Sequence, residues 1–383
     1  MKRLWILCVV CMLIANFAFA ETHIDPVGDR GIIPQAAEAH VSEAGISPTT
    51  GLTLSEINIP EGATGLAATG RYMPMMVQIS NPVSPKTKAA GTSNRAPWGV
   101  QYADLIYELP LHKNGETRLS AIFSDVIPTE AGPIRSARMG HVWLREEWDC
   151  GFMYYGQSTY KEGNVPAAFA SLGTEGKGVL FSGIVSSIHP WKQYYSRGYK
   201  RKAEPEDVNG NVAEISKLIP ETHIATNHTF LFTDEIYSGG DEANVIMVDW
   251  HRPSYNSMFE FDAETGAYKR SVADDKRNNT KYYPWIEFNT QEPLLLSNVI
   301  VQWTPTEFIR VDIPVTCNVE AMGHPGEGNA DIFMCGRHIS GYWKREGMNT
   351  RTVFYDENGQ EISLQRGKTM IIQLPLDREC YYE

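Results

Sequence analysis

Apolar and polar positions in the first half of the chain follow two different periods, one typical of strands and one of helices. Strand-like apolar runs, each bounded by polar or Gly-rich loops, occupy residues 73–79, 103–109, 117–126 and 150–155. Helical spacing of apolar residues marks residues 139–148, 165–172 and 212–218. Strands and helices in this order predict a mixed α/β domain over residues 71–240.

The second half of the chain carries shorter β patterns at close spacing. The strand-like runs are residues 245–250, 257–261, 268–272, 298–302, 309–315, 330–334, 338–344, 352–355 and 369–374. Turn signals such as Glu264-Thr265-Gly266 and Glu357-Asn358-Gly359 separate them. This pattern predicts a mostly antiparallel β domain over residues 241–383. The chain as a whole is therefore expected to be an α+β protein.

The N-terminus has the pattern of an export signal. Lys2 and Arg3 precede an apolar run of about 16 residues, which ends in the small-residue cleavage motif Ala18-Phe19-Ala20. The run is at the short limit for a membrane-spanning helix, and no later segment reaches that length without charges. We therefore expect cleavage of residues 1–20 near Ala20, leaving a soluble protein without a transmembrane anchor in the periplasm or at the cell surface. Residues 21–70, rich in small and polar side chains, are expected to form a flexible tether.

Charge narrows the range of partners. The formal net charge is −12, and loss of Lys2 and Arg3 makes it more negative, so nucleic acids and anionic membranes are poor partners. Residues 189–202 depart from this balance, because Lys and Arg side chains there lie among aromatic residues such as Trp191, beside His189. Such a stretch can contact sugars or acidic polymers. The simpler interpretation is an exposed loop with amphipathic side chains.

Four cysteines, Cys150, Cys317, Cys335 and Cys380, lie beyond the signal segment. An even number in an oxidising compartment permits disulfides, and the preferred pair is Cys317 with Cys335, because both lie at the ends of strand-like runs. Beyond residue 20 there is no C-x-x-C or H-x-x-x-H spacing, so we expect no metal site. No other cofactor is indicated.

The most distinctive motif is Gly132-Pro133-Ile134-Arg135-Ser136-Ala137-Arg138, where a strand-like run gives way to a helix-like one. Arg135 and Arg138 flank Ser136 at the predicted helix start, where backbone N–H groups are unpaired. Guanidinium groups and free N–H groups both favour carboxylate or phosphate. The alternative is structural: the arginines pair with acidic residues of the same domain and fix the turn.

Two carboxylates lie close to this motif in the predicted fold. Asp104 and Glu108 are four residues apart in an otherwise apolar strand, so their side chains are expected on one face. Together with Arg118 and the arginine pair they would form a single charged cluster. As a functional site, the cluster would use Glu108 as the acid or base, with its pKa raised by burial. As a structural network, it would only stabilise the turn.

These motifs resemble the YerB-type lipoprotein family. The segments that carry the resemblance are residues 103–108, 117–123, 132–138, 298–302, 341–344, 352–356 and 367–369. The resemblance covers about residues 71–376 and implies an exported bacterial protein of two domains, from a family without an established activity. The usual lipobox of the family is missing, which puts membrane anchoring in doubt. The family's His-Asn-aromatic segment corresponds to residues 227–232 here and implies a role for His228.

Two kinds of function are consistent with these observations. The first is a non-enzymatic envelope protein that binds an anionic cell-wall polymer or an envelope protein partner. The second is a hydrolase or transferase acting on peptidoglycan or a related polymer, with Glu108 as general acid or base. The first is favoured because the sequence carries no recognised catalytic signature. The residues expected to bind the ligand are Asp104, Arg118, Arg135, Ser136, Arg138, His189, Trp191 and His228.

Overall fold

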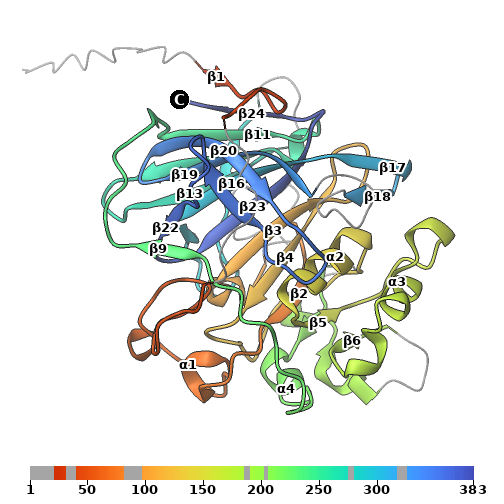
Figure 1. Cartoon of the computed structure of the whole chain (residues 1–383). Coiled ribbons are helices and arrows are strands. Elements are labelled where there is room, and N and C mark those ends of the chain that lie inside the picture. Colours follow the sequence, from red (N-terminus) through yellow and green to blue (C-terminus); the bar gives the residue numbers. More distant parts are fainter. Residues whose placement is uncertain are drawn as a thin grey trace, which may run out of the picture.

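Strands make up most of the regular structure of the protein, and its helices are few (Figure 1). The computed structural model describes residues 21–31, 40–81, 97–184, 190–201, 206–274, 280–316 and 326–383. The expected signal segment, His189 and Cys317 lie outside these ranges. The predicted α+β class is correct only in that both kinds of element occur, because the protein is mainly β.

An eleven-stranded sheet of the described residues runs through both halves of the sequence (Figure 1). In spatial order its strands are β10 (Asp241–Glu242), β20 (Arg337–Lys344), β19 (Glu327–Met334), β16 (Asn298–Thr304), β23 (Thr369–Pro375), β3 (Leu105–Pro110), β4 (Thr117–Phe123), β2 (Met75–Ser80), β5 (Gly151–Tyr154) and β6 (Leu180–Ser182), with β21 (Val353–Asp356) beside β20. The halves meet where β23 lies parallel to β3, with Thr369 opposite Leu105. The two domains expected from the sequence therefore share one sheet.

A second sheet of seven described strands packs against one face of the first. Its strands are β1 (Thr22–His23), β24 (Glu379–Tyr382), β11 (Val245–Asp249), β12 (Ser257–Asp262), β13 (Ala267–Ala273) and β14 (Tyr282–Pro284), with β15 (Leu295–Leu296) beside β13. One continuous core holds Ile106 and Leu119 of the large sheet together with Phe259 and Tyr268 of the small one. Burial of this apolar surface is the main stabilising contribution of the fold.

The other face of the large sheet is covered by helices α2 and α3. Here Val142 and Trp148 of α2 and Phe169 of α3 pack with Tyr107 and Ile300 of the sheet. The helices are α1 (Leu66–Thr69), α2 (Met139–Trp148), α3 (Val165–Ser171) and α4 (Val212–Ser216), with 3₁₀ turns η1 (Leu54–Glu56), η3 (Val100–Tyr102), η4 (Lys161–Gly163), η5 (Glu175–Lys177), η6 (Pro190–Tyr194), η7 (Tyr199–Arg201) and η8 (Pro253–Tyr255). Both faces of the large sheet are covered, so strands such as β2 are apolar along most of their length.

Three short strand pairs complete the described structure. They are β17 (Thr306–Arg310) with β18 (Ile313–Thr316), β22 (Ser363–Gln365) with β9 (Leu231–Thr233), and β7 (Tyr195–Ser196) with β8 (Asn209–Gly210). The first pair corrects the sequence prediction, which placed one strand over residues 309–315. The chain turns back at Val311 and Asp312, so the predicted strand is a hairpin.

The expected tether over residues 21–70 is also corrected at several places, because parts of this range pack against the rest of the protein. Thr22 in β1 pairs with Tyr382 in β24, and the Arg30 guanidinium forms an ion pair with the buried Asp331 at 2.7 Å. Further along, Thr49 and its neighbours are almost completely buried. The small, polar composition that indicated disorder thus belongs to a segment that packs across both halves of the protein.

A buried ion pair connects the two sheets. Glu108 of β3 accepts a hydrogen bond from Arg270 of β13 at 3.0 Å, and both side chains are fully buried. The other Glu108 oxygen accepts from Asn81 Nδ2 at 2.8 Å and from Thr117 Oγ1 at 2.7 Å. Burial raises the pKa of Glu108, although the nearby Arg270 charge opposes the shift. Glu108 therefore links the large sheet to the small sheet inside the core.

Glu108→Gln should lower the free energy of unfolding by about 3–5 kcal/mol, because it leaves the Arg270 charge buried without its counter-charge. Arg270→Gln should have a cost of the same order for the complementary reason. The double variant should lose clearly less than the sum of the two single losses. Urea unfolding of all four proteins at neutral pH measures this coupling, and strictly additive losses would contradict it.

Candidate anion-binding site

The arginine motif lies where two parallel strands separate. Strands β2 and β5 pair only over Met75–Val77 and Gly151–Met153, and the motif fills the gap beyond. The Arg135 N–H donates to Gln78 O at 2.9 Å, while its carbonyl accepts from the Tyr155 N–H at 2.9 Å. The carboxyl end of parallel strands is where ligand sites commonly form in such sheets.

Gly156 lets the motif approach β5 closely. Its φ of 87° lies in the left-handed region, and a Cβ there would come within 2.8 Å of Ser136 Oγ. Its carbonyl accepts from the Ala137 N–H at 2.9 Å. Ser136 Oγ itself donates to Tyr155 O at 3.0 Å, so this predicted ligand-binding hydroxyl holds the loop in place.

Three predicted arginines come together at this point. Arg118 reaches across from β4 and donates to Ser136 O, while Arg138 donates to Ala137 O at 2.9 Å. Arg135 forms an ion pair with Glu206 at 3.5 Å. Within the part of the chain that the structure describes, neither Arg118 nor Arg138 forms an ion pair. The cluster therefore holds more positive than negative charge.

The electrostatics of the cluster favour an anion. Burial, together with the charges of Arg138 and Arg135, lowers the pKa of Arg118 to about 9. Burial also lowers the pKa of Arg138, with the Asp312 charge opposing the shift and the Arg135 charge adding to it. Because arginine stays charged at neutral pH, these shifts mean that positive charge is confined here at a cost in free energy. A bound anion would reduce that cost.

Helix α2 begins directly after the cluster, as the sequence predicts. Arg138 is its N-cap residue, and the Arg138 N–H donates to Nδ1 of His141 at 2.9 Å. Burial and then the charges of Arg118 and Arg138 lower the pKa of His141 well below its usual range. His141 is thus a neutral imidazole, and the positive end of the helix dipole adds to the guanidinium charges.

The basic aromatic stretch borders the same site. Asp207 accepts a bidentate pair of hydrogen bonds from Arg197, next to the Glu206 that pairs with Arg135. Trp191 is partly buried and packs edge-on against Phe181 of the core, with ring centroids 5.2 Å apart. The structure does not describe His189.

The two predicted carboxylates are not part of the arginine cluster, which corrects the expected single site. Asp104 Oδ2 accepts from the N–H groups of Ser124 at 2.6 Å and Asp125 at 2.9 Å, beside Lys368. Glu108 lies against Arg270, as described above. The strand rises about 3.3 Å per residue, so positions four apart share a face and yet contact different neighbours.

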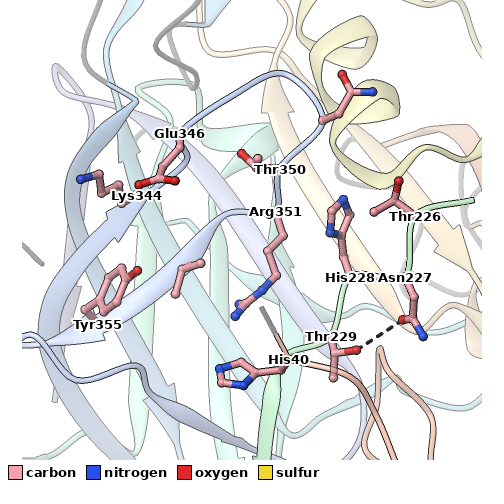
Figure 2. Close-up of a pocket in the computed structure, with 12 residues that line it drawn as sticks. His40, Thr226, Asn227, His228, Thr229, Lys344, Glu346, Thr350, Arg351 and Tyr355 are labelled. Carbon is pink, nitrogen blue, oxygen red and sulfur yellow. Dashed lines mark hydrogen bonds between the residues drawn. The ribbon is translucent and has the colours of Figure 1, made fainter. Parts of the chain in front are cut away.

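His228 also lies elsewhere, in a pocket of its own between residues 226–229 and 344–355 (Figure 2). Burial lowers the pKa of His228, with the Arg351 and Arg345 charges acting in the same direction and Glu147 opposing them. His228 therefore belongs to a different site from the arginine cluster.

Sequence reasoning missed several residues of these sites. His141 follows Arg138 by one helical turn, and that spacing was a usable signal. Glu206, Asp312, Lys368 and Arg351 reach their partners from distant segments, and no local pattern marks them. Of the described cysteines, Cys150, Cys335 and Cys380 are free thiols, while the preferred partner Cys317 lies outside the described residues.

Two further absences hold for the described ranges. They contain no group of three His, Cys, Asp or Glu side chains placed to hold a metal ion. None of their helices has the length and apolar character needed to cross a membrane.

The buried Asp104 carboxyl should make the stability of the protein depend on pH. Burial and then the Asp125 charge raise its pKa well above the usual range, with Lys368 opposing the shift. The native state therefore binds this proton more tightly than the unfolded state, and the stability due to Asp104 falls as pH rises from about 4 through the raised pKa. Asp104→Asn removes this titration, so its stability relative to the unmodified protein should rise between pH 4 and 7. Urea unfolding across this range tests the sign, and a constant or falling difference would count against it.

Comparison with known proteins gives the family of the chain. The N-terminal and C-terminal domains of DUF3048, described as proteins of unknown function, match residues 63–225 and 246–371. "Putative lipoprotein YerB" of Bacillus subtilis (strain 168) is 25% identical over 279 residues, or 72% of this chain and 76% of the relative. The crystal structure of the YerB protein from Bacillus subtilis matches with a TM-score of 0.64 at 20% identity, covering 88% of this chain and 99% of that one, which shows a shared fold. The chain belongs to the DUF3048 family, as the YerB-type resemblance of its motifs implied.

Proposed function

We propose that this protein is exported to the cell envelope and binds an anionic cell-wall polymer through Arg118, Arg135 and Arg138. The observation that carries the proposal is the buried Arg118 guanidinium, which forms no ion pair among the described residues and lies beside Arg135 and Arg138. Arginine forks bind carboxylate and phosphate oxygens in bidentate geometry. The clustering matters because the chain as a whole is acidic.

Two observations support export to the envelope. The first 20 residues have the composition of a secretory signal. The relative YerB carries a name that describes a lipoprotein, which is a class of envelope protein. A polymer of the wall would then be accessible to the arginine cluster.

The alternative of a polymer hydrolase or transferase has weaker support. Its proposed acid or base, Glu108, is fully buried, and both of its oxygens accept hydrogen bonds from neighbouring side chains. A general acid must come within hydrogen-bond reach of the substrate. We therefore propose binding rather than catalysis.

Arg138→Gln should weaken binding to isolated cell-wall sacculi that retain their anionic polymers. Loss of a charge-assisted hydrogen bond costs about 1.5–3 kcal/mol, which corresponds to a dissociation constant roughly tenfold or more higher. Binding of the unmodified protein should also fall as salt is raised, since screening weakens charge attraction. Co-sedimentation with the purified protein measures both effects.

Arg337→Gln is the matched control. It removes the same charge from β20, where Arg337 pairs with Glu242 at the surface, and it should leave sedimentation unchanged. Equal binding to sacculi stripped of anionic polymers would contradict the proposal. Mass spectrometry of the supernatant supplies a further criterion, because wall fragments released by the protein would favour the enzymatic alternative.

A further inference from the structure

The pocket that contains His228 is built from three separate parts of the chain (Figure 2). Residues 226–229 form one wall, and residues 344–355 of β20, β21 and the loop between them form another. His40, from the N-terminal segment, closes the lower side in Figure 2. The volume is about 320 Å³, which suits a small ligand.

His228 lines this pocket and carries a hydrogen-bonding atom that no described residue uses. Its side chain packs edge-on against Trp148, with ring centroids 6.1 Å apart, and the residue is 8% exposed. Nε2 is buried and has no hydrogen-bond partner among the described residues. An unsatisfied buried polar atom costs about 1–3 kcal/mol. Such an atom in a native fold calls for an explanation, and a ligand that accepts its hydrogen bond would supply one.

Arg351 lines the same pocket and carries a second unused atom. Its Nη2 donates to Glu361 Oε1 at 2.6 Å, and Glu361 also contacts His40 Nε2 at 2.9 Å. Arg351 is only 9% exposed, and its Nη1 is buried and has no partner within the described structure. Glu361 therefore holds one arm of the guanidinium and leaves Nη1 without a partner among the described residues. Figure 2 shows the Arg351 side chain between His228 and Tyr355.

The chemistry of the two atoms defines the ligand group. Nη1 of Arg351 can only donate, and a neutral imidazole donates from Nε2 when the proton is on that nitrogen. A ligand group with oxygen acceptors can accept hydrogen bonds from both nitrogens. Glu361 already balances the Arg351 charge, and the opposite charges of Lys344 and Glu346, which also line the pocket, offset each other. A singly charged group therefore fits better than a phosphate dianion.

We propose that this pocket binds the carboxylate of a small polar ligand, with His228 and Arg351 as its hydrogen-bond donors. The hydroxyl and amide groups of Thr226, Asn227 and Thr350 line the space beside them and can hold the polar body of the ligand. Two sources share this chemistry, the C-terminus of a peptide and a free organic acid. The site is independent of the arginine cluster and does not rest on the function proposed above.

The test uses isothermal titration of the purified protein with three probes: N-acetyl-alanyl-alanine, the same dipeptide with a C-terminal amide, and succinate. The free dipeptide acid should bind at least roughly tenfold more tightly than the amide, because the amide loses the charged acceptor. Binding of the dipeptide acid alone assigns the site to peptide termini. Binding of succinate as well assigns it to small carboxylates in general. Failure of both acids to bind at about 10 mM would overturn the proposal.

Variants separate the pocket from other contacts. Arg351→Lys keeps a positive charge for Glu361 and loses the second N–H arm, while His228→Phe keeps a ring and loses Nε2. Each should weaken binding of the acid by roughly tenfold. A cooperative unfolding transition shows that each variant is folded. Arg337→Lys, at the surface of β20, is the control and should bind as the unmodified protein does. Unchanged affinity in both pocket variants would also overturn the proposal.

Discussion

The parallel pairing of β23 with β3 is the contact on which the rest of the structure depends. It joins strands from the two halves of the sequence into one sheet, and the small sheet and the helices cover the two faces that result. The Glu108–Arg270 pair then connects the layers beside this seam. Neither half has a complete core without the other, although the family profiles divide the chain into two domains.

The two candidate sites use this framework differently. The arginine cluster forms where β2 and β5 separate, so its geometry follows from backbone hydrogen bonds within the N-terminal half. The His228 pocket forms where the loop between β20 and β21 meets residues 226–229, and the Arg351 side chain is oriented by Glu361. One site concentrates charge and the other leaves single polar atoms unsatisfied. They therefore suit ligands of different size and charge.

Features of the structure that depend on neighbouring residues could be predicted from the sequence, and features that depend on residues far apart in the chain could not. The helix after Arg138 and most long strands were predicted correctly, because the local periodicity of apolar residues determines them. The charge of Lys368 beside Asp104 and the pairing of Glu108 with Arg270 were not predictable, because each partner comes from a distant strand or loop. Arg351 carried no signal for the same reason. The tether prediction failed because it rested on the small and polar composition of residues 21–70. Composition does not show which residues of such a segment will pair with distant strands.

The docking of the N-terminal segment also has a consequence for how the chain folds. Arg30 bonds to Asp331, 301 positions later, and β1 pairs with the last strand of the chain. Contacts of such sequence separation close very large loops, and proteins rich in them fold slowly. Residues 21–31, the first that the structure describes, lack their packing partners until the last strands of the chain are in place. We therefore expect residues 21–31 to dock late in folding, after the C-terminal strands have formed.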